Sequence, residues 1–331
     1  MTDFDTTPSP SAGHGGHGGR DQCCSEYAVS TTSRRSFLRG LTAASGATMF
    51  GTAFLQTTFA TPAEAVTNPN VLVALSLRGG ADMLSLVVPH GDPGYAAARP
   101  TIKVPTASLI KRDAMFGLHP ALSPLAGLWD TKQMAAVTAV GLAAPNRSHF
   151  EAMEEVEDAN PGDASRSGWL NRTLGLDASS SPSEGVHIGS GMLPTALYGA
   201  EQALAIGEVD SVRLNGPTGA ARSRALRQVW AGTGGDLGNS ARSALSTAEQ
   251  FKGVTGRAYT PAAGVKYPTS DLGNALKEAA RLIKAGLGVR AITVDYGSWD
   301  MHANLGAVGD TRPMSMQVMA RDLAEALAVF F

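Results

Sequence analysis

The 331-residue chain contains very little cysteine and little charge. Its two cysteines, Cys23 and Cys24, are adjacent, which is poor geometry for a disulfide bond and supplies too few thiolates for a zinc ribbon. Charged residues make up 17% of the chain, and 27 basic against 29 acidic side chains leave a net charge of −2. This balance excludes the strongly basic surface of a typical nucleic-acid-binding protein, so no nucleic-acid partner is expected.

Several common catalytic motifs are also missing. The chain has no G-x-S-x-G elbow, no P-loop and no H-E-x-x-H helix. The glycines at positions 232–238 lack both the preceding strand and the spacing of a dinucleotide-binding loop. What remains is a chain with 43% apolar residues and 38 glycines, which predicts a globular protein rich in loops.

The N-terminal region has the features of an export signal. Residues 1–32 are polar and of low complexity, and we expect them to be a disordered leader. Residues 33–39, SRRSFLR, precede a moderately apolar stretch at 40–60 and the small-x-small sequence Ala63-Glu64-Ala65. Segment 33–65 therefore resembles a twin-arginine signal peptide, which implies the twin-arginine export machinery as a partner and a periplasmic or extracellular location. The alternative is that segment 40–60 is retained as a membrane anchor. If it is not retained, we expect the chain to contact the membrane only through the signal segment.

The remaining domain, 66–331, shows strands alternating with helices. Near-continuous apolar runs predict strands at 71–77, 135–140 and 291–295, the first as a central strand buried on both faces. Apolar residues at helical spacing predict helices after Ser148, over 272–283 and over 313–331. This order predicts an α/β fold with a mainly parallel sheet flanked by helices. The Gly-, Ser- and Thr-rich segment 178–268 is expected to be a loop-rich insertion over that sheet.

Three polar clusters follow the predicted strands, where ligands of open α/β sheets bind. Asp82 follows Gly79-Gly80, which would let the backbone turn closely around an ion; the alternative is an Asp that caps its own turn. Ser148 begins an S-x-x-E capping box, yet a helix N-terminus also favours an anion beside a nucleophilic hydroxyl, and Arg147 could bind the same anion. Asp300 and His302 lie two residues apart, so in an extended segment both could reach one divalent ion or simply hydrogen-bond to each other.

The succession of motifs resembles the DUF1501 family. The motifs span nearly all of residues 70–331 and are Arg78-Gly79-Gly80-Ala81-Asp82, Leu118–Leu122, Asn146-Arg147-Ser148-His149-Phe150, Ser167–Leu170 and Trp299-Asp300-Met301-His302-Ala303-Asn304. That family in turn is similar to the alkaline phosphatase and sulfatase superfamily, whose members use divalent metals to cleave phosphate or sulfate esters. The chain departs from the usual family pattern at Met83, Ser85, Ser298, Met301 and Leu305.

The resemblance implies a role for each candidate residue. Asp82, Asp300 and His302 would bind a divalent metal (Zn, Mn, Ca or Mg), Ser148 would be the nucleophile, and Arg147 would stabilise charge on the transferred group. The substrate would be a small-molecule or envelope ester. In the superfamily a further strand and an Asp-His pair complete the metal site, and this sequence stops before any such residues. We therefore expect a C-terminally truncated family member with an exposed sheet edge, whose truncation could leave it inactive. The alternative is a non-catalytic envelope binding protein on the same fold.

Overall fold

The computed structural model describes residues 54–56, 70–144, 146–160, 166–176, 181–189, 191–214 and 219–331. All of these belong to the compact unit Ser45–Phe331, whereas the other unit, Met1–Ala44, lies outside the described residues. The predicted leader at 1–32, the SRRSFLR motif and the Ala63-Glu64-Ala65 sequence also lie outside them. Of the apolar stretch 40–60, only the strand Phe54–Gln56 is described.

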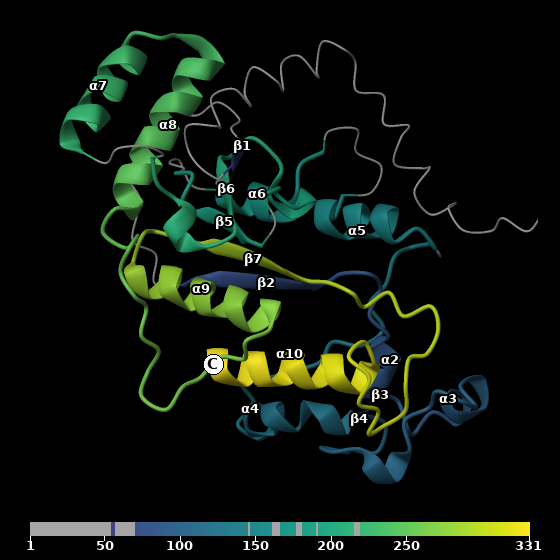
Figure 1. The fold of residues 1–331 in the computed structure, drawn as a ribbon. Coiled ribbons are helices and arrows are strands. Elements are labelled where there is room, and N and C mark those ends of the chain that lie inside the picture. Colours follow the sequence, from purple (N-terminus) through teal and green to yellow (C-terminus); the bar gives the residue numbers. More distant parts are fainter. Residues whose placement is uncertain are drawn as a thin grey trace, which may run out of the picture. The chain divides into compact units, whose positions relative to one another are not determined.

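A five-stranded sheet forms the centre of this unit, in the order β1-β6-β5-β7-β2 (Figure 1). Its strands β6, β5, β7 and β2 are parallel to their neighbours, and β1 joins the far edge antiparallel to β6. The predicted α/β class with a mainly parallel sheet is therefore confirmed. The bounds are β1, Phe54–Gln56; β2, Leu72–Leu77; β5, Gly185–Ile188; β6, Ala203–Ile206; and β7, Ala291–Tyr296.

Alternate side chains of these strands bury on opposite faces of the sheet. On β6, Leu204 and Ile206 join the large core, whereas Ala203 and Ala205 join a smaller core on the other face. On β7, Ile292 and Val294 join the large core, and Ala291 joins the smaller one. Both faces are therefore covered by other elements, as a parallel sheet requires.

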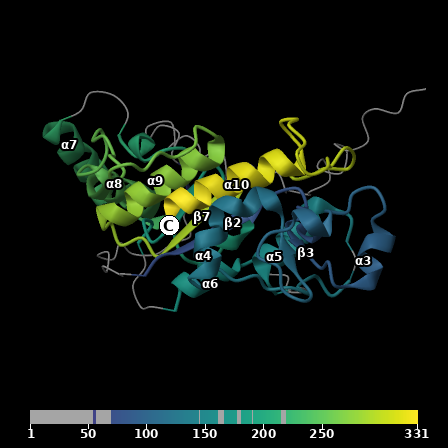
Figure 2. The same ribbon diagram turned by 90° about the horizontal axis from the view of Figure 1, so that it is seen from below.

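Helices α9 (Asp271–Ala285) and α10 (Met316–Phe330) lie side by side over the large core (Figures 1 and 2). Helix α10 also packs on the 3-10 helix η3 (Pro120–Leu125), which leads into α4 (Ala126–Asp130). The other face of the sheet is covered by α6 (Trp169–Leu174) and the 3-10 helix η4 (Thr195–Leu197), against which α5 (His149–Asp158) packs.

A second, two-stranded sheet of β3 (Val87–Val88) and β4 (Gly117–Leu118) follows the loop after β2. The short helices α2 (Met83–Leu86) and α3 (Pro93–Ala98) flank β3. Helices α7 (Ala220–Ala231) and α8 (Gly235–Phe251) form a hairpin that extends away from the main sheet, in green in Figure 1. None of the helices in the part of the chain that the structure describes has the length and apolar character needed to span a membrane.

Four sequence predictions need correction. Segment 178–268 is not simply an insertion, because it supplies β5 and β6 to the main sheet, and only α7 and α8 extend outward. Residues 135–140 are not a strand, and the side chains of Val137 and Val140 are 83% and 79% exposed, so this apolar run buries no face. Strand β2 is at the edge of the sheet rather than at its centre, with Leu72 47% exposed. The last helix begins after its N-cap Ser315 instead of at Pro313.

Candidate metal centre

The structure brings Asp300 and His302 together with His149, a residue 151 positions away from Asp300 along the chain. His149 is the first residue of α5, and the other two residues follow the carboxyl end of β7. The Nε2 atom of His149 lies 2.9 Å from Asp300 Oδ1 and 3.2 Å from His302 Nε2, and His302 Nε2 lies 2.5 Å from Asp300 Oδ1. Among the described residues this is the one group of three or more His, Cys, Asp or Glu side chains that could hold a metal ion.

The three ligand atoms lie close enough together to hold one cation. Two imidazole nitrogens and one carboxylate oxygen around a tetrahedral zinc-like ion would lie about 3.4 Å apart, given metal–ligand bonds of about 2.1 Å. The distances of 2.9 and 3.2 Å at His149 are near that value, whereas the 2.5 Å between His302 Nε2 and Asp300 Oδ1 is shorter and is that of a direct hydrogen bond or ion pair. Hydrogen bonding of both imidazoles to Asp300 is the alternative, because a carboxylate oxygen can accept two N–H groups.

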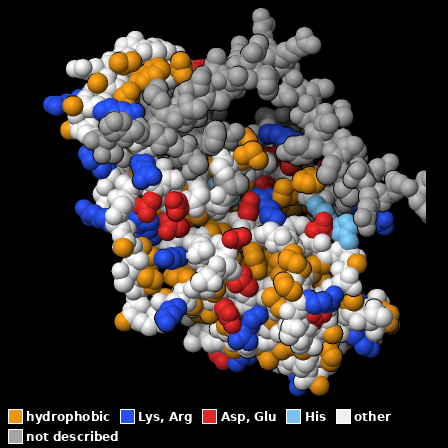
Figure 3. Space-filling model, in the orientation of Figure 1, with side chains coloured by type: hydrophobic (Ala, Val, Ile, Leu, Met, Phe, Trp, Pro, Cys, Tyr) orange, Lys and Arg blue, Asp and Glu red, His pale blue; other side chains and the backbone are white. Residues whose placement is uncertain are grey.

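The cluster is open to solvent. The side chains of His149, Asp300 and His302 are 41%, 44% and 73% exposed, and Figure 3 shows histidine side chains beside acidic ones on the surface. Three protein ligands leave coordination positions free, which is the arrangement of catalytic rather than structural metal sites. A substrate could therefore reach an ion held by these three residues.

The two glycines after β2 make room for the cluster. A Cβ atom on Gly79 would lie 2.6 Å from the backbone nitrogen of Asp300, and one on Gly80 would lie 3.3 Å from the His149 ring. Both glycines also have positive φ angles, +103° and +83°, which other residues rarely adopt. The Gly79-Gly80 turn therefore packs against two of the three metal-ligand candidates, a role consistent with the predicted close turn around an ion site.

Ser148 caps α5, as the capping-box pattern predicts. Its Oγ accepts a hydrogen bond of 3.3 Å from the backbone N–H of Glu151, and its own N–H donates to Asn146 Oδ1 at 2.8 Å. The hydroxyl is thus adjacent in the chain to the ligand candidate His149. Arg147, which precedes it, is exposed.

Asp82 lies in a different environment from the cluster. Its carboxylate forms an ion pair with Arg99 and accepts a hydrogen bond of 2.7 Å from Ser85 Oγ. The structure therefore joins two of the three predicted metal ligands, Asp300 and His302, and adds His149 in place of Asp82. His149 was within the polar cluster 146–149 that the sequence singles out, but nothing in its spacing shows that the start of α5 lies against the end of β7.

Burial disfavours the charged form of two histidines elsewhere in the fold. His119 is 2% exposed, and burial lowers its pKa to about 4, while its Nδ1 accepts a hydrogen bond from the Ala121 N–H at 3.1 Å. His187 on β5 is fully buried, burial lowers its pKa, and its Nδ1 lies 3.0 Å from Thr293 Oγ1. Neither histidine is part of the exposed cluster.

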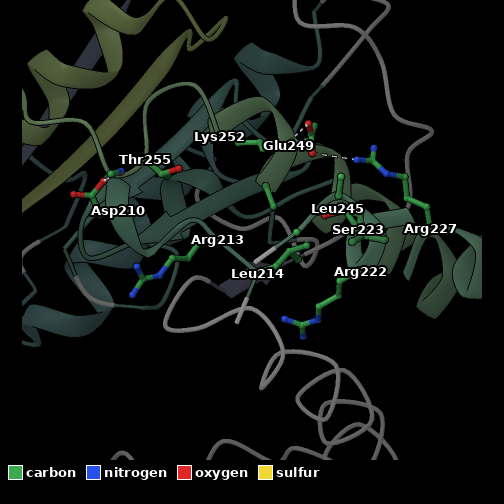
Figure 4. Close-up of a pocket in the computed structure, with 14 residues that line it drawn as sticks. Asp210, Arg213, Leu214, Arg222, Ser223, Arg227, Leu245, Glu249, Lys252 and Thr255 are labelled. Atoms are coloured by element: carbon green, nitrogen blue, oxygen red, sulfur yellow. Dashed lines mark hydrogen bonds and ion pairs between the residues drawn. The ribbon is translucent and has the colours of Figure 1, made fainter. Parts of the chain in front are cut away.

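A cavity lies apart from the cluster residues. It measures about 550 Å³, and it lies between the α7–α8 hairpin and the loop that carries Asp210 and Arg213 (Figure 4). Its rim includes the ion pair of Arg227 with Glu249, at 3.1 Å. None of the candidate catalytic or metal-binding residues lines this cavity. No family model, curated protein or solved structure matches the chain.

Proposed function

We propose that the chain is an exported, divalent-metal-dependent hydrolase of phosphate or sulfate esters, of the DUF1501 type, with the metal held by His149, Asp300 and His302. The observation that carries the proposal is the convergence of two imidazole nitrogens and a carboxylate oxygen within 4.8 Å of one another at the carboxyl end of the sheet. The sequence resemblance supplies the reaction class. A two-histidine, one-carboxylate set fits zinc or manganese better than calcium, which prefers oxygen ligands.

The residues around the cluster suit such a reaction. A bound divalent ion would supply Lewis acidity for an ester oxygen. The Ser148 hydroxyl lies at the N-terminus of α5, where the helix dipole and free N–H groups stabilise negative charge. The Glu151 N–H that donates to Ser148 Oγ would also stabilise that oxygen as it loses its proton. Arg147 is an exposed cation next to it and would bind the charged group of the ester.

Two observations favour a second candidate, a metal-binding envelope protein without catalysis. The Ser148 hydroxyl is already engaged as the helix cap, and the Asp82 carboxylate is paired with Arg99. In that case the cluster would bind a metal or a metal-bridged partner, and no ester would be cleaved. The two candidates share the metal site and differ only in turnover.

Metal binding tests what both candidates share. The full chain, titrated with Zn²⁺, Mn²⁺, Ca²⁺ and Mg²⁺ by calorimetry, should bind one transition-metal ion, and His149→Ala and His302→Ala should each abolish tight binding. The matched control is His90→Ala, because the ring of His90 contacts a backbone oxygen, that of Asp113, instead of a cluster residue. Equal affinity in all four proteins would contradict the proposed site.

Turnover separates the two candidates. The metal-loaded chain is assayed with generic aryl phosphate and aryl sulfate esters, and the hydrolase proposal expects release of the aryl alcohol that disappears in His302→Ala. Metal binding without any turnover would favour the non-catalytic candidate.

The export part of the proposal has its own test. Replacing Arg34 and Arg35 together by Lys should leave the chain in the cytoplasm of a bacterium with a twin-arginine pathway, whereas the parent chain should be recovered outside it with a new N-terminus near Val66. Recovery of the parent chain in the membrane fraction, with segment 40–60 retained, would instead support the anchor alternative.

A further inference from the structure

Arg78 lies where the three segments of the metal centre meet. It directly follows β2 and precedes Gly79-Gly80, which pack against Asp300 and His149. Its backbone extends the pairing with the β7 segment beyond the strand end, since its N–H donates to Tyr296 O at 2.9 Å and its carbonyl accepts from Trp299 N at 3.0 Å. The residue before Asp300 is therefore hydrogen-bonded to Arg78.

The Arg78 side chain binds the other two segments. Its guanidinium forms one ion pair with Glu157 of α5, at 2.6 Å, and another with Asp295 of β7, at 2.9 Å. The Arg78 and Glu157 side chains are only 16% and 10% exposed. Glu157 is near the last turn of the helix that begins at His149, and its second oxygen accepts a hydrogen bond of 3.2 Å from the Ala196 N–H. One side chain thus connects the helix of His149 to the strand that leads to Asp300 and His302.

The charges of this buried layer depend on Arg78. Burial raises the pKa of Glu157, and the Arg78 cation opposes that rise. Burial lowers the pKa of His187. The Arg78 cation lowers this pKa further, whereas the Asp295 carboxylate raises it. Without the guanidinium, the carboxylates of Glu157 and of the 31% exposed Asp295 would lose the cation between them, and the connection that it makes between α5 and β7 would be absent.

We propose that Arg78 is the positioning residue of the metal centre, which uses its two ion pairs to hold the start of α5 and the loop after β7 at the separation that one metal ion requires. The proposal rests on the proposed metal site. Arg78 itself contacts no ligand atom, and its effect passes through Glu157, Asp295 and the Gly79-Gly80 turn. A guanidinium suits this role because its two terminal nitrogens can approach two carboxylates at once, as Nη1 and Nη2 do here, whereas a lysine ammonium is a point charge.

The test compares Arg78→Lys with Arg290→Lys. Arg290 is a matched control because its side chain is equally exposed, at 16%, and forms an ion pair with the buried Glu184, but it precedes β7 at the end opposite to Asp295. With Co²⁺ as a visible spectroscopic probe, Arg78→Lys should lower the metal affinity by about 10- to 100-fold and alter the absorption bands that report ligand geometry. Arg290→Lys should leave the affinity and the bands unchanged at a similar loss of thermal stability.

Three results would overturn the proposal: a folded Arg78→Lys protein with parent-like affinity and spectrum, an equal loss of affinity in Arg290→Lys, or an unchanged affinity in Glu157→Gln. The last variant is close in shape to the parent and serves if Arg78→Lys does not fold. Hydrogen exchange without metal separates this proposal from the metal site itself. Arg78→Lys should speed exchange of the α5 backbone amides even if the parent chain binds no metal, and unchanged exchange would refute the connection between α5 and β7.

Discussion

The buried His119 predicts a loss of stability in mild acid. Its side chain is 2% exposed, and burial lowers its pKa from 6.5 to about 4. Protonation would also turn the Nδ1 atom, which accepts the Ala121 N–H, into a donor that faces another donor. Because the unfolded chain binds a proton more readily than the folded chain, this residue's contribution is fully present above pH 6.5 and is lost as the pH falls toward 4.

The size of the effect follows from the two pKa values. A difference between 6.5 and about 4 corresponds to about 3 kcal/mol when the loss is complete. At pH 5, the same linkage gives a loss of about 2 kcal/mol in the free energy of unfolding. That is a large part of the stability of an ordinary domain, about 5–15 kcal/mol.

His119→Asn isolates this contribution. An asparagine can still accept the Ala121 N–H through its side-chain oxygen, and it does not titrate. Urea unfolding of the parent and the variant is measured at several pH values between 7.5 and 4.5, with a chelator present so that metal binding does not contribute. We expect the variant to be less stable than the parent at pH 7.5, because asparagine fills less of the buried site. The difference in the free energy of unfolding between the two proteins should become about 2 kcal/mol smaller at pH 5. His187 titrates in both proteins, so its effect cancels. Parallel pH profiles would refute the reasoning.

Three further variants test the cluster and the core. Gly79→Ala should reduce metal affinity and lower the free energy of unfolding by about 1–3 kcal/mol, because its Cβ would lie 2.6 Å from Asp300 N at a φ of +103°. The control is Gly141→Ala, whose Cβ would meet no atom within 4 Å and which should leave the affinity unchanged in the same titration. Asp82→Asn should leave metal affinity unchanged if pairing with Arg99 is its role, and a large loss would restore Asp82 as a ligand. Phe251→Ala removes a fully buried ring and should lower the free energy of unfolding by about 3–5 kcal/mol in urea titrations.

The parts of the fold that follow simple patterns could be predicted. The run at 71–77 and the run at 291–295 became β2 and β7, which pair in parallel, and the apolar stripe at 272–283 became α9. Strand β5 could not be found this way, and β6 is indicated only as a short element of unassigned type around residues 203–207. They have four residues each, GVHI and ALAI, and their glycine, histidine and alanines have little strand preference by themselves.

Residues 135–140 show the opposite error. Their composition favours a strand, but a strand is stable only where it finds a partner and buries a face, and Val137 and Val140 are largely exposed. A local pattern also cannot predict where a strand lies in the sheet, because β2 is as apolar as a central strand and yet lies at the edge.

In the candidate site, too, local sequence patterns predict one part and tertiary contacts determine the other. Asp300 and His302 could be paired from their spacing alone, because the side chains of residues two positions apart in an extended segment point to the same side. His149 joins them only because α5 begins beside the end of β7, which is a tertiary contact between residues more than 150 positions apart. Asp82 is outside the group of three, and its carboxylate pairs with Arg99 at the end of α3, a contact that its spacing in the sequence does not predict.

Ser148 is the residue at which capping and catalysis can be separated. Its oxygen accepts the Glu151 N–H while its own proton remains available, so the cap does not prevent it from acting as a nucleophile. Asparagine caps helices as well as serine does, but it has no hydroxyl. Ser148→Asn should therefore keep the parent's thermal stability and metal affinity and abolish ester turnover. Ser148→Ala should abolish turnover too, but at a cost of about 1 kcal/mol in the free energy of unfolding. If Ser148→Asn turns over esters at the parent rate, the hydroxyl is only a cap, and the attacking group of any hydrolysis at this cluster must be sought elsewhere.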